Sequence, residues 1–322
     1  MRLLERLSAV WRRPDIAIFH RFEKGPYGGA NQFLVALRRE LEQREFRVAA
    51  NLVGPHTRAA LLNAYAFDAD RLRRQRYPGC RIVHRVDGPV GRYRGQDATI
   101  DHRIADLNKE FAAATVFQSR YSQAAHEEIG LAFQSPVVIP NGVDPVIFHA
   151  IGRALWDPGR KIRLISTSWS DNPRKGGSTY KWIEEHLDWS RFEYTFIGRS
   201  PVRFDRIRTM PPLSSRPLAE ELRAHDVYVT ASQDDPCSNA LLEALACHLP
   251  ALALRSGGHP ELVAGGGVLF DGTDDVLDAL RELVTNYEVR QASIRLVPLG
   301  EIVDRYLAVL LPAASGTLER RP

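Results

Sequence analysis

Short apolar runs alternate with stretches of helical periodicity along most of the chain. In the first half, the runs that predict strands lie at 15–20, 46–53, 81–86, 115–118 and 137–140. Helical spacing follows the first run, where apolar residues between 33 and 41 share one face, and it recurs at 101–113 and 121–129. Strands that alternate with helices are typical of parallel sheets with helices on both faces.

The same alternation restarts after the segment 141–144. Further strands are predicted at 161–167, 192–197, 226–230, 251–254 and 267–270, with helices at 178–186, 218–224, 239–247 and 273–285. We therefore expect an α/β fold of two doubly wound, Rossmann-like domains, at 15–145 and 146–298, that face an interdomain cleft. A C-terminal helix at 299–313 and a flexible tail at 314–322 complete the expected organisation.

Residues 1–14 form an amphipathic segment ahead of the first strand. Leucines, a valine and Trp11 share one helical face, and mostly basic residues occupy the other. One hypothesis is peripheral contact of residues 2–13 with an anionic membrane surface. The alternative is that the apolar face packs on the protein's own core or on a second subunit.

The composition is that of an ordinary globular protein. Of the 322 residues, 44% are hydrophobic and 25% are charged, which excludes disordered and fibrous proteins. No apolar run approaches the roughly 18 residues of a membrane-spanning helix, and charged residues interrupt the start where a secretory signal would have its apolar core. The three cysteines form no CxxC pair. We expect a cytoplasmic protein, with the inner face of the cell membrane as a second location.

Positive charge is concentrated in the first half. Residues 1–150 carry 22 Lys and Arg against 16 Asp and Glu, a net charge of +6, and the remainder carries 21 against 23, a net charge of −2. Such a face could meet anionic lipid, nucleic acid or a phosphorylated substrate, or it could be a solvated arginine-rich surface. No zinc-finger spacing or aromatic RNA-binding signature is present, so a nucleic-acid partner is not expected.

The richest chemistry lies at residues 232–250. This segment follows a predicted strand and enters a predicted helix, so that Asp235 stands on the loop and Glu243 inside the helix. Pro236 and Ser238 suit a helix start, where free backbone N–H groups favour a phosphate. Carboxylates beside such an anion site can accept hydrogen bonds from sugar hydroxyls. The segment therefore predicts a site for a nucleoside diphosphate linked to a sugar.

Asp235 and Glu243 are similar to the paired acidic motif of the retaining glycosyltransferases of family 4, which have the two-domain GT-B fold. Four further segments resemble motifs of the same family, in the right order: Gly28-Gly29-Ala30, Asn141-Gly142-Val143-Asp144, Arg174-Lys175-Gly176 and Ser256-Gly257-Gly258-His259-Pro260-Glu261. The resemblance runs from about residue 15 to residue 310.

The resemblance implies a role for each matching residue. Glu243 would bind the ribose hydroxyls of the donor nucleotide, and Asp235 would contact the transferred sugar. Lys175 would neutralise the diphosphate leaving group without a metal, with Arg174 as a second positive charge. The remaining donor contacts would come from the loop residues Gly28 and Gly29 and from backbone amides near Asn239 and Ala240.

The chain departs from the family pattern at several positions, two of which bear on the site. Trp169 and Ser170 stand where the family usually carries an arginine. At the end of an early strand, where many members carry a histidine near the acceptor and the sugar, the alignment puts Asp87, with His84 three residues earlier. Asp87 is thus the first candidate for a catalytic residue on the acceptor side, and His84 is the second.

The function that the resemblance implies is that of a retaining, metal-independent, hexosyltransferase-type enzyme. It would move a sugar from a UDP- or GDP-linked donor, bound by domain 146–298, to a hydroxyl acceptor, bound by domain 15–145. The acceptor would be a glycan, a glycolipid or a phosphorylated small molecule in surface polysaccharide, lipopolysaccharide or glycolipid assembly. No cofactor is expected. The alternatives are a nucleotide-sugar epimerase of the same fold, and a catalytically degenerate GT-B module that binds nucleotide or sugar.

Overall fold

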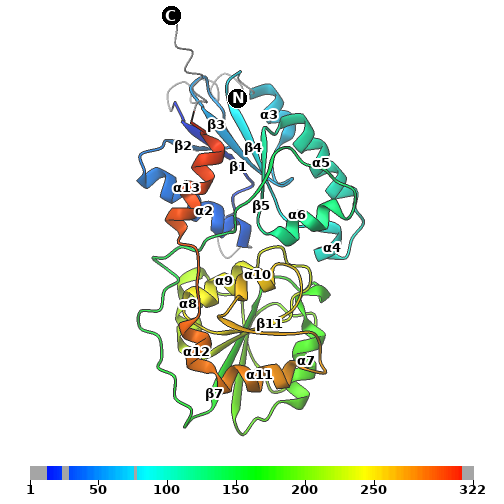
Figure 1. Cartoon of the computed structure of the whole chain (residues 1–322), viewed down its shortest axis with the longest axis vertical. Coiled ribbons are helices and arrows are strands. Elements are labelled where there is room, and N and C mark those ends of the chain that lie inside the picture. The colour runs from blue at the N-terminus through cyan, green and yellow to red at the C-terminus, as the bar shows by residue number, and fades with distance from the viewer. Residues whose placement is uncertain (1–12, 24–28, 76–77, 314–322) are drawn as a thin grey trace, which may run out of the picture.

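Two α/β units lie end to end in the computed structural model, which describes residues 13–23, 29–75 and 78–313 (Figure 1). Each unit contains a six-stranded sheet, and every pair of neighbouring strands runs parallel. The predicted α/β class with two doubly wound sheets is therefore confirmed. The amphipathic segment expected at 1–14 falls, apart from its last two residues, outside the described residues, as does the tail at 314–322.

The first sheet has the strand order β2-β1-β3-β4-β5-β6. Its strands are β1 Ile16–Phe19, β2 Val48–Ala50, β3 Ala59–Asn63, β4 Arg81–Val86, β5 Ala114–Phe117 and β6 Pro136–Val138. The helices of this unit are α2 Gly29–Gln43, α3 Ala69–Gln75, α4 Val90–Arg94, α5 Thr99–Phe111 and α6 Arg120–Glu127. Side chains of α2 pack on one face of the sheet, and those of α3 and α5 pack on the other. The strands are apolar on both faces because both faces are covered.

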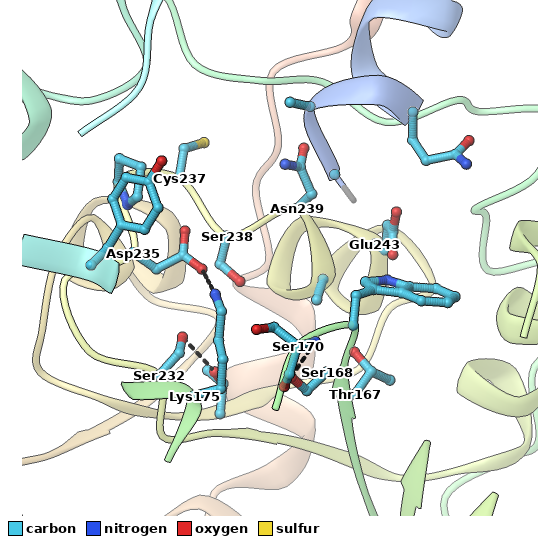
Figure 2. A pocket seen from close by; sticks show the side chains of 18 of the residues that line it. Thr167, Ser168, Ser170, Lys175, Ser232, Asp235, Cys237, Ser238, Asn239 and Glu243 are labelled. Carbon is cyan, nitrogen blue, oxygen red and sulfur yellow. Dashed lines mark hydrogen bonds and ion pairs between the residues drawn. The ribbon is translucent and has the colours of Figure 1, made fainter. Parts of the chain in front are cut away.

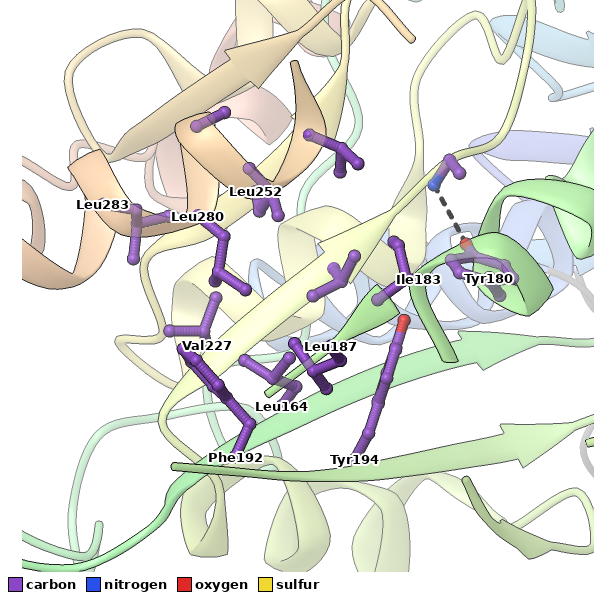
Figure 3. Close-up of a cluster of buried hydrophobic side chains, with 14 of the residues drawn as sticks. Leu164, Tyr180, Ile183, Leu187, Phe192, Tyr194, Val227, Leu252, Leu280 and Leu283 are labelled. Atoms are coloured by element: carbon purple, nitrogen blue, oxygen red, sulfur yellow. Dashed lines mark hydrogen bonds between the residues drawn. The ribbon is translucent and has the colours of Figure 1, made fainter. Parts of the chain in front are cut away.

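The second sheet has the strand order β12-β11-β10-β7-β8-β9. Its strands are β7 Ile162–Ser168, β8 Phe192–Gly198, β9 Arg208–Met210, β10 Val227–Thr230, β11 Ala251–Leu254 and β12 Gly267–Phe270. The helices are the short η1 Pro173–Lys175, α7 Gly177–His186, α8 Ser215–Ala224, α9 Asn239–Ala246, α10 His259–Val263, α11 Val276–Thr285 and α12 Tyr287–Ala292. On one face, α7 and α11 close the hydrophobic cluster drawn in Figure 3, and α8 and α9 cover the other face.

The last helix, α13 Leu299–Leu310, returns to the first unit. It lies beside α2 (Figure 1), and Ile302, Val303 and Tyr306 are fully buried in the core of the first sheet. The chain therefore crosses between the units twice, once near residues 139–148 and once just before α13. No helix in the described part of the chain is long and apolar enough to span a bilayer.

Two strands were not predicted from the sequence. Strand β3 is an Ala-Ala-Leu-Leu-Asn run that is buried throughout, and alanine and leucine favour a helix as readily as a strand. Strand β9 is a short, largely exposed edge strand without an apolar pattern. In both cases the pairing with a neighbouring strand, rather than local propensity, decides the structure.

Candidate active site

A cavity of about 270 Å³ opens between the two units, at the carboxyl ends of both sheets. The second sheet reverses its strand order between β7 and β10, and doubly wound folds bind ligands at such a reversal. Trp169 and Ser170 follow β7, Ser232 and Asp235 follow β10, and all of them line the cavity. The opposite wall belongs to the first unit and consists of Gly29, Ala30, Gln32, Asp87, Tyr93 and Gln118. The cavity is thus shared by both units.

One wall carries an ion pair between Lys175 and Asp235 (Figure 2). Lys175 Nζ donates to Asp235 Oδ2 over 2.9 Å. The charge of Asp235 raises the pKa of Lys175. Burial alone would raise the pKa of Asp235, but the charges of Lys175 and His259, with the hydrogen bonds from Lys175 and the Cys237 backbone, together lower it. Both groups are therefore ionised at neutral pH, and the ammonium group is available to an anionic ligand.

The turn after Lys175 fixes the direction of the lysine. Asn172 begins η1, and its side chain accepts a hydrogen bond from the backbone N–H of Arg174 over 2.9 Å. Gly176 then adopts a φ of 86°, and a Cβ atom there would overlap the backbone of Ala231. This close approach holds Lys175 against the loop that follows β10.

Glu243 lies in α9, with its carboxylate at the cavity (Figure 2). The residue is only 7% exposed. Burial raises the pKa of Glu243 to about 8, and among the described residues no group donates a hydrogen bond to its carboxylate. A buried acid without a partner is costly. The position is therefore suited to a ligand that supplies hydroxyl donors.

Two helix starts converge on the same cavity. Helix α9 begins at Asn239, where the Ser238 hydroxyl accepts from the backbone N–H of Leu241 over 3.4 Å. Helix α2 begins at Gly29, and a Cβ atom there would overlap the Asn239 side chain. Free N–H groups and the positive end of a helix dipole favour anions. The predicted loop residue Gly28 lies outside the described residues.

Asp87 follows β4 and lines the cavity from the first unit. Its Oδ1 accepts hydrogen bonds from Arg85 Nη1, over 3.0 Å, and from Gln118 Nε2. The carboxylate is 22% exposed, so it is held on one side and open to the cavity on the other. Of the two predicted acceptor-side residues, Asp87 is the one that reaches the cavity.

His84 does not reach the cavity. Its side chain is fully buried, with Nε2 2.7 Å from the Ala64 carbonyl oxygen and Nδ1 3.3 Å from Asn108 Nδ2. Burial lowers the pKa of His84 to about 4. Side chains alternate along a strand, so residues 84 and 87, at an odd spacing, point to opposite faces of the sheet. His84 is therefore a neutral core residue of the first unit.

Arg174 also lies outside the cavity lining. It donates to Asp234 over 2.7 Å, and Asp234 accepts from the Tyr121 hydroxyl of α6 over 2.9 Å. Beside them, the Glu261 carboxylate accepts from the backbone N–H groups of Arg120 and Tyr121, over 3.0 and 2.9 Å. Arg174 and Glu261 thus belong to the contact between the two units.

Metal ligands are not grouped in the described part of the chain. Among residues 13–23, 29–75 and 78–313, no three His, Cys, Asp or Glu side chains come together in a way that could hold an ion. The positive charge that the described residues bring to the cavity comes from Lys175 and from the two helix starts.

Comparison with known proteins finds similarity to glycosyltransferases. A family model described as "Glycosyl transferases group 1" matches residues 191–286. A D-inositol 3-phosphate glycosyltransferase from Corynebacterium efficiens is 25% identical over 257 residues, which cover 73% of this chain and 57% of that protein. Within the second unit, residues 191–286 are thus similar to the group 1 glycosyltransferases. A protein of the same description from Geodermatophilus obscurus is 37% identical over 95 residues, or 28% of this chain and 21% of its own length.

Solved structures place the chain in the GT-B fold. The structure of Anabaena HepE in complex with UDP and glucose aligns with a TM-score of 0.68 at 14% identity, and covers 93% of this chain and 100% of that one. Sucrose-phosphate synthase from Thermosynechococcus elongatus aligns with a TM-score of 0.66 at 15% identity, and covers 92% of this chain and 94% of that one. The chain spans over half, but less than two thirds, of the length of the first Corynebacterium relative.

Gln118, Tyr93 and Arg85 are among the residues at the cavity that sequence reasoning missed. Gln118 and Tyr93 line the cavity, and Arg85 donates a hydrogen bond to Asp87 without lining the cavity itself. Gln118 follows β5 as Asp87 follows β4, so the rule that polar residues after parallel strands meet at one edge could have found it. Arg85 offered no such signal, because an arginine inside an apolar strand is recognised only when its partners are known.

Proposed function

We propose that the chain is a retaining glycosyltransferase that moves a sugar from a nucleoside-diphosphate donor to a hydroxyl acceptor. One observation carries the proposal: Lys175 and the unpartnered carboxylate of Glu243 line one cavity at the start of α9. A cation beside free helix N–H groups suits a diphosphate, and a buried carboxylate without a donor suits ribose hydroxyls. Together these groups fit a nucleotide sugar.

The donor would bind with its diphosphate against Lys175 and the starts of α9 and α2. Glu243 would accept hydrogen bonds from the ribose hydroxyls, and Asp235 would contact the transferred sugar while it holds Lys175 in place. Arg174 is not part of this set, because it pairs with Asp234 at the domain contact. We further propose that no metal is needed, since Lys175 and the helix starts supply the positive charge.

During transfer, the bond between the anomeric carbon and the diphosphate oxygen would break while the acceptor hydroxyl oxygen bonds to the same face of that carbon. The hydroxyl proton would pass to the departing phosphate oxygen, so that configuration is retained without a protein nucleophile. Lys175 would stabilise the negative charge that grows on the diphosphate. A single contribution of this type is worth about 10²–10³ in rate. Asp87 would orient the acceptor hydroxyl from the opposite wall.

The acceptor is proposed to carry a phosphate or to be borne on a membrane. Relatives that are named for D-inositol 3-phosphate and the net charge of +6 in residues 1–150 favour an anionic acceptor. Assembly of a glycolipid, a lipopolysaccharide or a surface polysaccharide is the proposed setting.

Calorimetric titration with UDP and with GDP tests the donor site. The titrations use wild type, Glu243→Ala and the control Glu220→Ala, which removes an exposed carboxylate of α8, all with a chelator present. We expect one nucleotide to bind, and Glu243→Ala to weaken it about tenfold or more, as the loss of hydrogen bonds to a charged group predicts. Affinity should be higher at pH 8.5 than at pH 6.5, because the carboxylate must ionise to accept both hydroxyls.

The result also separates the alternatives. If neither nucleotide binds, or if Glu220→Ala is as damaging as Glu243→Ala, the donor site is refuted. Turnover of a UDP- or GDP-sugar to its epimer without an acceptor would indicate the epimerase. Tight nucleotide binding with neither transfer nor hydrolysis would indicate the degenerate module.

A further inference from the structure

Arg85 is a buried cation at the acceptor wall of the cavity. It lies in β4, its side chain has no exposed surface, and the guanidinium group stands 5.2 Å from the centre of the Phe33 ring. Asp87 is the only carboxylate paired with it in the described part of the chain. Burying an arginine carries a large desolvation cost, which a single partly exposed carboxylate offsets poorly. A role other than stability is therefore indicated.

The contacts of Arg85 spread in three directions. Nη1 donates to Asn63 Oδ1 over 2.5 Å and to Asp87 Oδ1 over 3.0 Å. Nη2 donates to Asn141 Oδ1 over 2.8 Å. Asn63 ends β3, Asp87 follows β4, and Asn141 lies in the first crossover between the units. One rigid, planar group thus joins two strand ends to the segment that leads to the second unit.

These contacts close into a ring. Asn141 Nδ2 donates to Gln118 Oε1 over 2.8 Å, and Gln118 Nε2 donates to Asp87 Oδ1, which Arg85 also contacts. From this ring, Asn141 Nδ2 also donates to Asn239 Oδ1, at the start of α9, over 3.2 Å. The acceptor-side carboxylate is thereby tied to the helix start where the donor diphosphate is proposed to bind.

We propose that Arg85 is a positioning residue that sets Asp87 relative to the start of α9. The inference rests on the proposed glycosyl transfer and deepens it, because Arg85 itself touches neither donor nor acceptor. The ring fixes the Asp87 carboxylate on the side away from the cavity and leaves its other side free. Loss of the guanidinium group removes the hydrogen bonds that Arg85 donates to Asp87 and to Asn141. The Asp87 carboxylate is then no longer held at a fixed position relative to the start of α9. Misplacement of a reacting group by about 1 Å can cost about 10²-fold in rate.

Kinetics of matched variants test this role. Arg85→Met removes the donors with little change in side-chain length, Arg85→Lys keeps only the charge, and Asn141→Ala cuts the link to Asn239. The control is Asn108→Ala, which disrupts another buried hydrogen-bonded group of the first unit, away from the cavity. Each variant is measured for its Tm, for the Kd of UDP, and for UDP release from UDP-glucose with and without D-inositol 3-phosphate.

We expect Arg85→Met to lower kcat about 10²-fold while the Kd of UDP stays within about threefold of wild type. Arg85→Lys should recover part of that loss, and Asn108→Ala should lower the Tm with kcat within about twofold. The double variant Arg85→Met/Asp87→Asn should be no slower than Asp87→Asn alone, because both changes remove the same interaction. A parallel fall of Tm, UDP binding and kcat in Arg85→Met, or full additivity in the double variant, would overturn the proposal.

A crystal structure of Arg85→Met with UDP gives a readout that needs no acceptor. The Asp87 carboxylate should move by about 1 Å or more from its wild-type position relative to Asn239. An unmoved Asp87 refutes the positioning role even if UDP binds. Failure of wild-type protein to bind either UDP or GDP would instead refute the proposed function, so the two failures are distinguishable.

Discussion

In the second unit, the two carboxylates that line the cavity, Asp235 and Glu243, lie close together in sequence, whereas in the first unit Asp87 and Gln118 come from the ends of separate strands. Asp235 and Glu243 belong to one loop and the helix it enters, and Lys175 follows a single turn after β7. On the opposite wall, Asp87 and Gln118 follow different strands and are held by Arg85 and by Asn141. Both walls thus lie at the carboxyl ends of parallel strands, but the polar groups of the first unit are linked to one another by hydrogen bonds, whereas Glu243 in the second unit has no such partner among the described residues.

This difference has a physical consequence. On the donor wall, Glu243 has no partner among the described residues, so its substitution should act mainly on ligand binding. On the acceptor wall, each polar group satisfies another, so removal of one leaves its buried neighbours without hydrogen bonds. Substitution of Glu243 should therefore act independently of its neighbours, whereas substitutions in the hydrogen-bonded group around Asp87 should give coupled effects.

The sharpest test of the donor wall compares two adjacent cations. Lys175→Ala should lower transfer by about 10²–10³, because it removes the charge that faces the leaving group. Arg174→Ala should lower it by no more than about tenfold, since an exposed ion pair such as Arg174–Asp234 contributes about 1 kcal/mol or less. Initial rates of nucleotide release for the two variants, at saturating donor, give the comparison. Equal losses would show that Arg174 reaches the diphosphate when donor binds.

A second test asks whether Asp87, which follows β4, or His84, within β4, acts on the acceptor. Asp87→Asn should lower transfer about 10²-fold, the lower range for a positioned acid or base, without weakening UDP binding. His84→Asn should instead lower the Tm and leave kcat within about threefold. Because the pKa of His84 is near 4, its ring stays neutral from pH 5 to 8 and adds no limb to the pH profile in that range. A pH limb near 6.5 that His84→Asn abolishes would contradict this assignment.

The sequence predicted the donor wall more fully than the acceptor wall, and the reason lies in how each is encoded. Asp235, Glu243 and Lys175 stand at fixed spacings within short motifs, so local pattern and family resemblance were enough to single them out. Arg85 lies in a strand whose apolar pattern predicts burial. Its role depends on contacts with Asn63 and Asn141, which are distant in sequence. Such a group can be found only after the fold has brought its partners together.

The same limit applies to His84 and Arg174, two predicted site residues that do not line the cavity in the structure. Both were chosen from their position next to a motif residue, without knowledge of side-chain direction. In β4, the alternation of side chains turns His84 into the core. In the loop after β7, Asp234 attracts Arg174 toward the domain contact and away from the cavity. In both cases the direction of the side chain, which the sequence pattern did not give, keeps the residue out of the cavity lining.

Burial of the Glu243 carboxylate should also lower the stability of the folded protein once the pH is high enough to ionise it. In the folded protein the pKa is raised from its ordinary value of 4.5 to about 8, so the protonated form is favoured. Its stabilising contribution is present below pH 4.5 and is lost as the pH rises through about 8. Glu243→Gln should therefore match wild type at pH 4.5 and gain a few degrees in Tm by pH 8.5 without nucleotide. Thermal melts across this range check the sign. A Glu243→Gln advantage that shrinks as the pH rises would contradict the burial argument.

The smallest expected effect concerns the contact that joins the two walls. Glu261 accepts hydrogen bonds from the first N–H groups of α6 in the other unit, as a helix-capping carboxylate does. Its loss in Glu261→Ala should cost about 1 kcal/mol, the usual worth of a cap, and lower the Tm by about 2–4 °C. Since the cap bridges the units, KM for the donor should rise while kcat changes little. Glu301→Ala, which removes an exposed carboxylate of α13, is the control. If KM is unchanged while the Tm falls, Glu261 serves α6 alone, and the hydrogen bond from Asn141 to Asn239 remains a contact that couples the two walls.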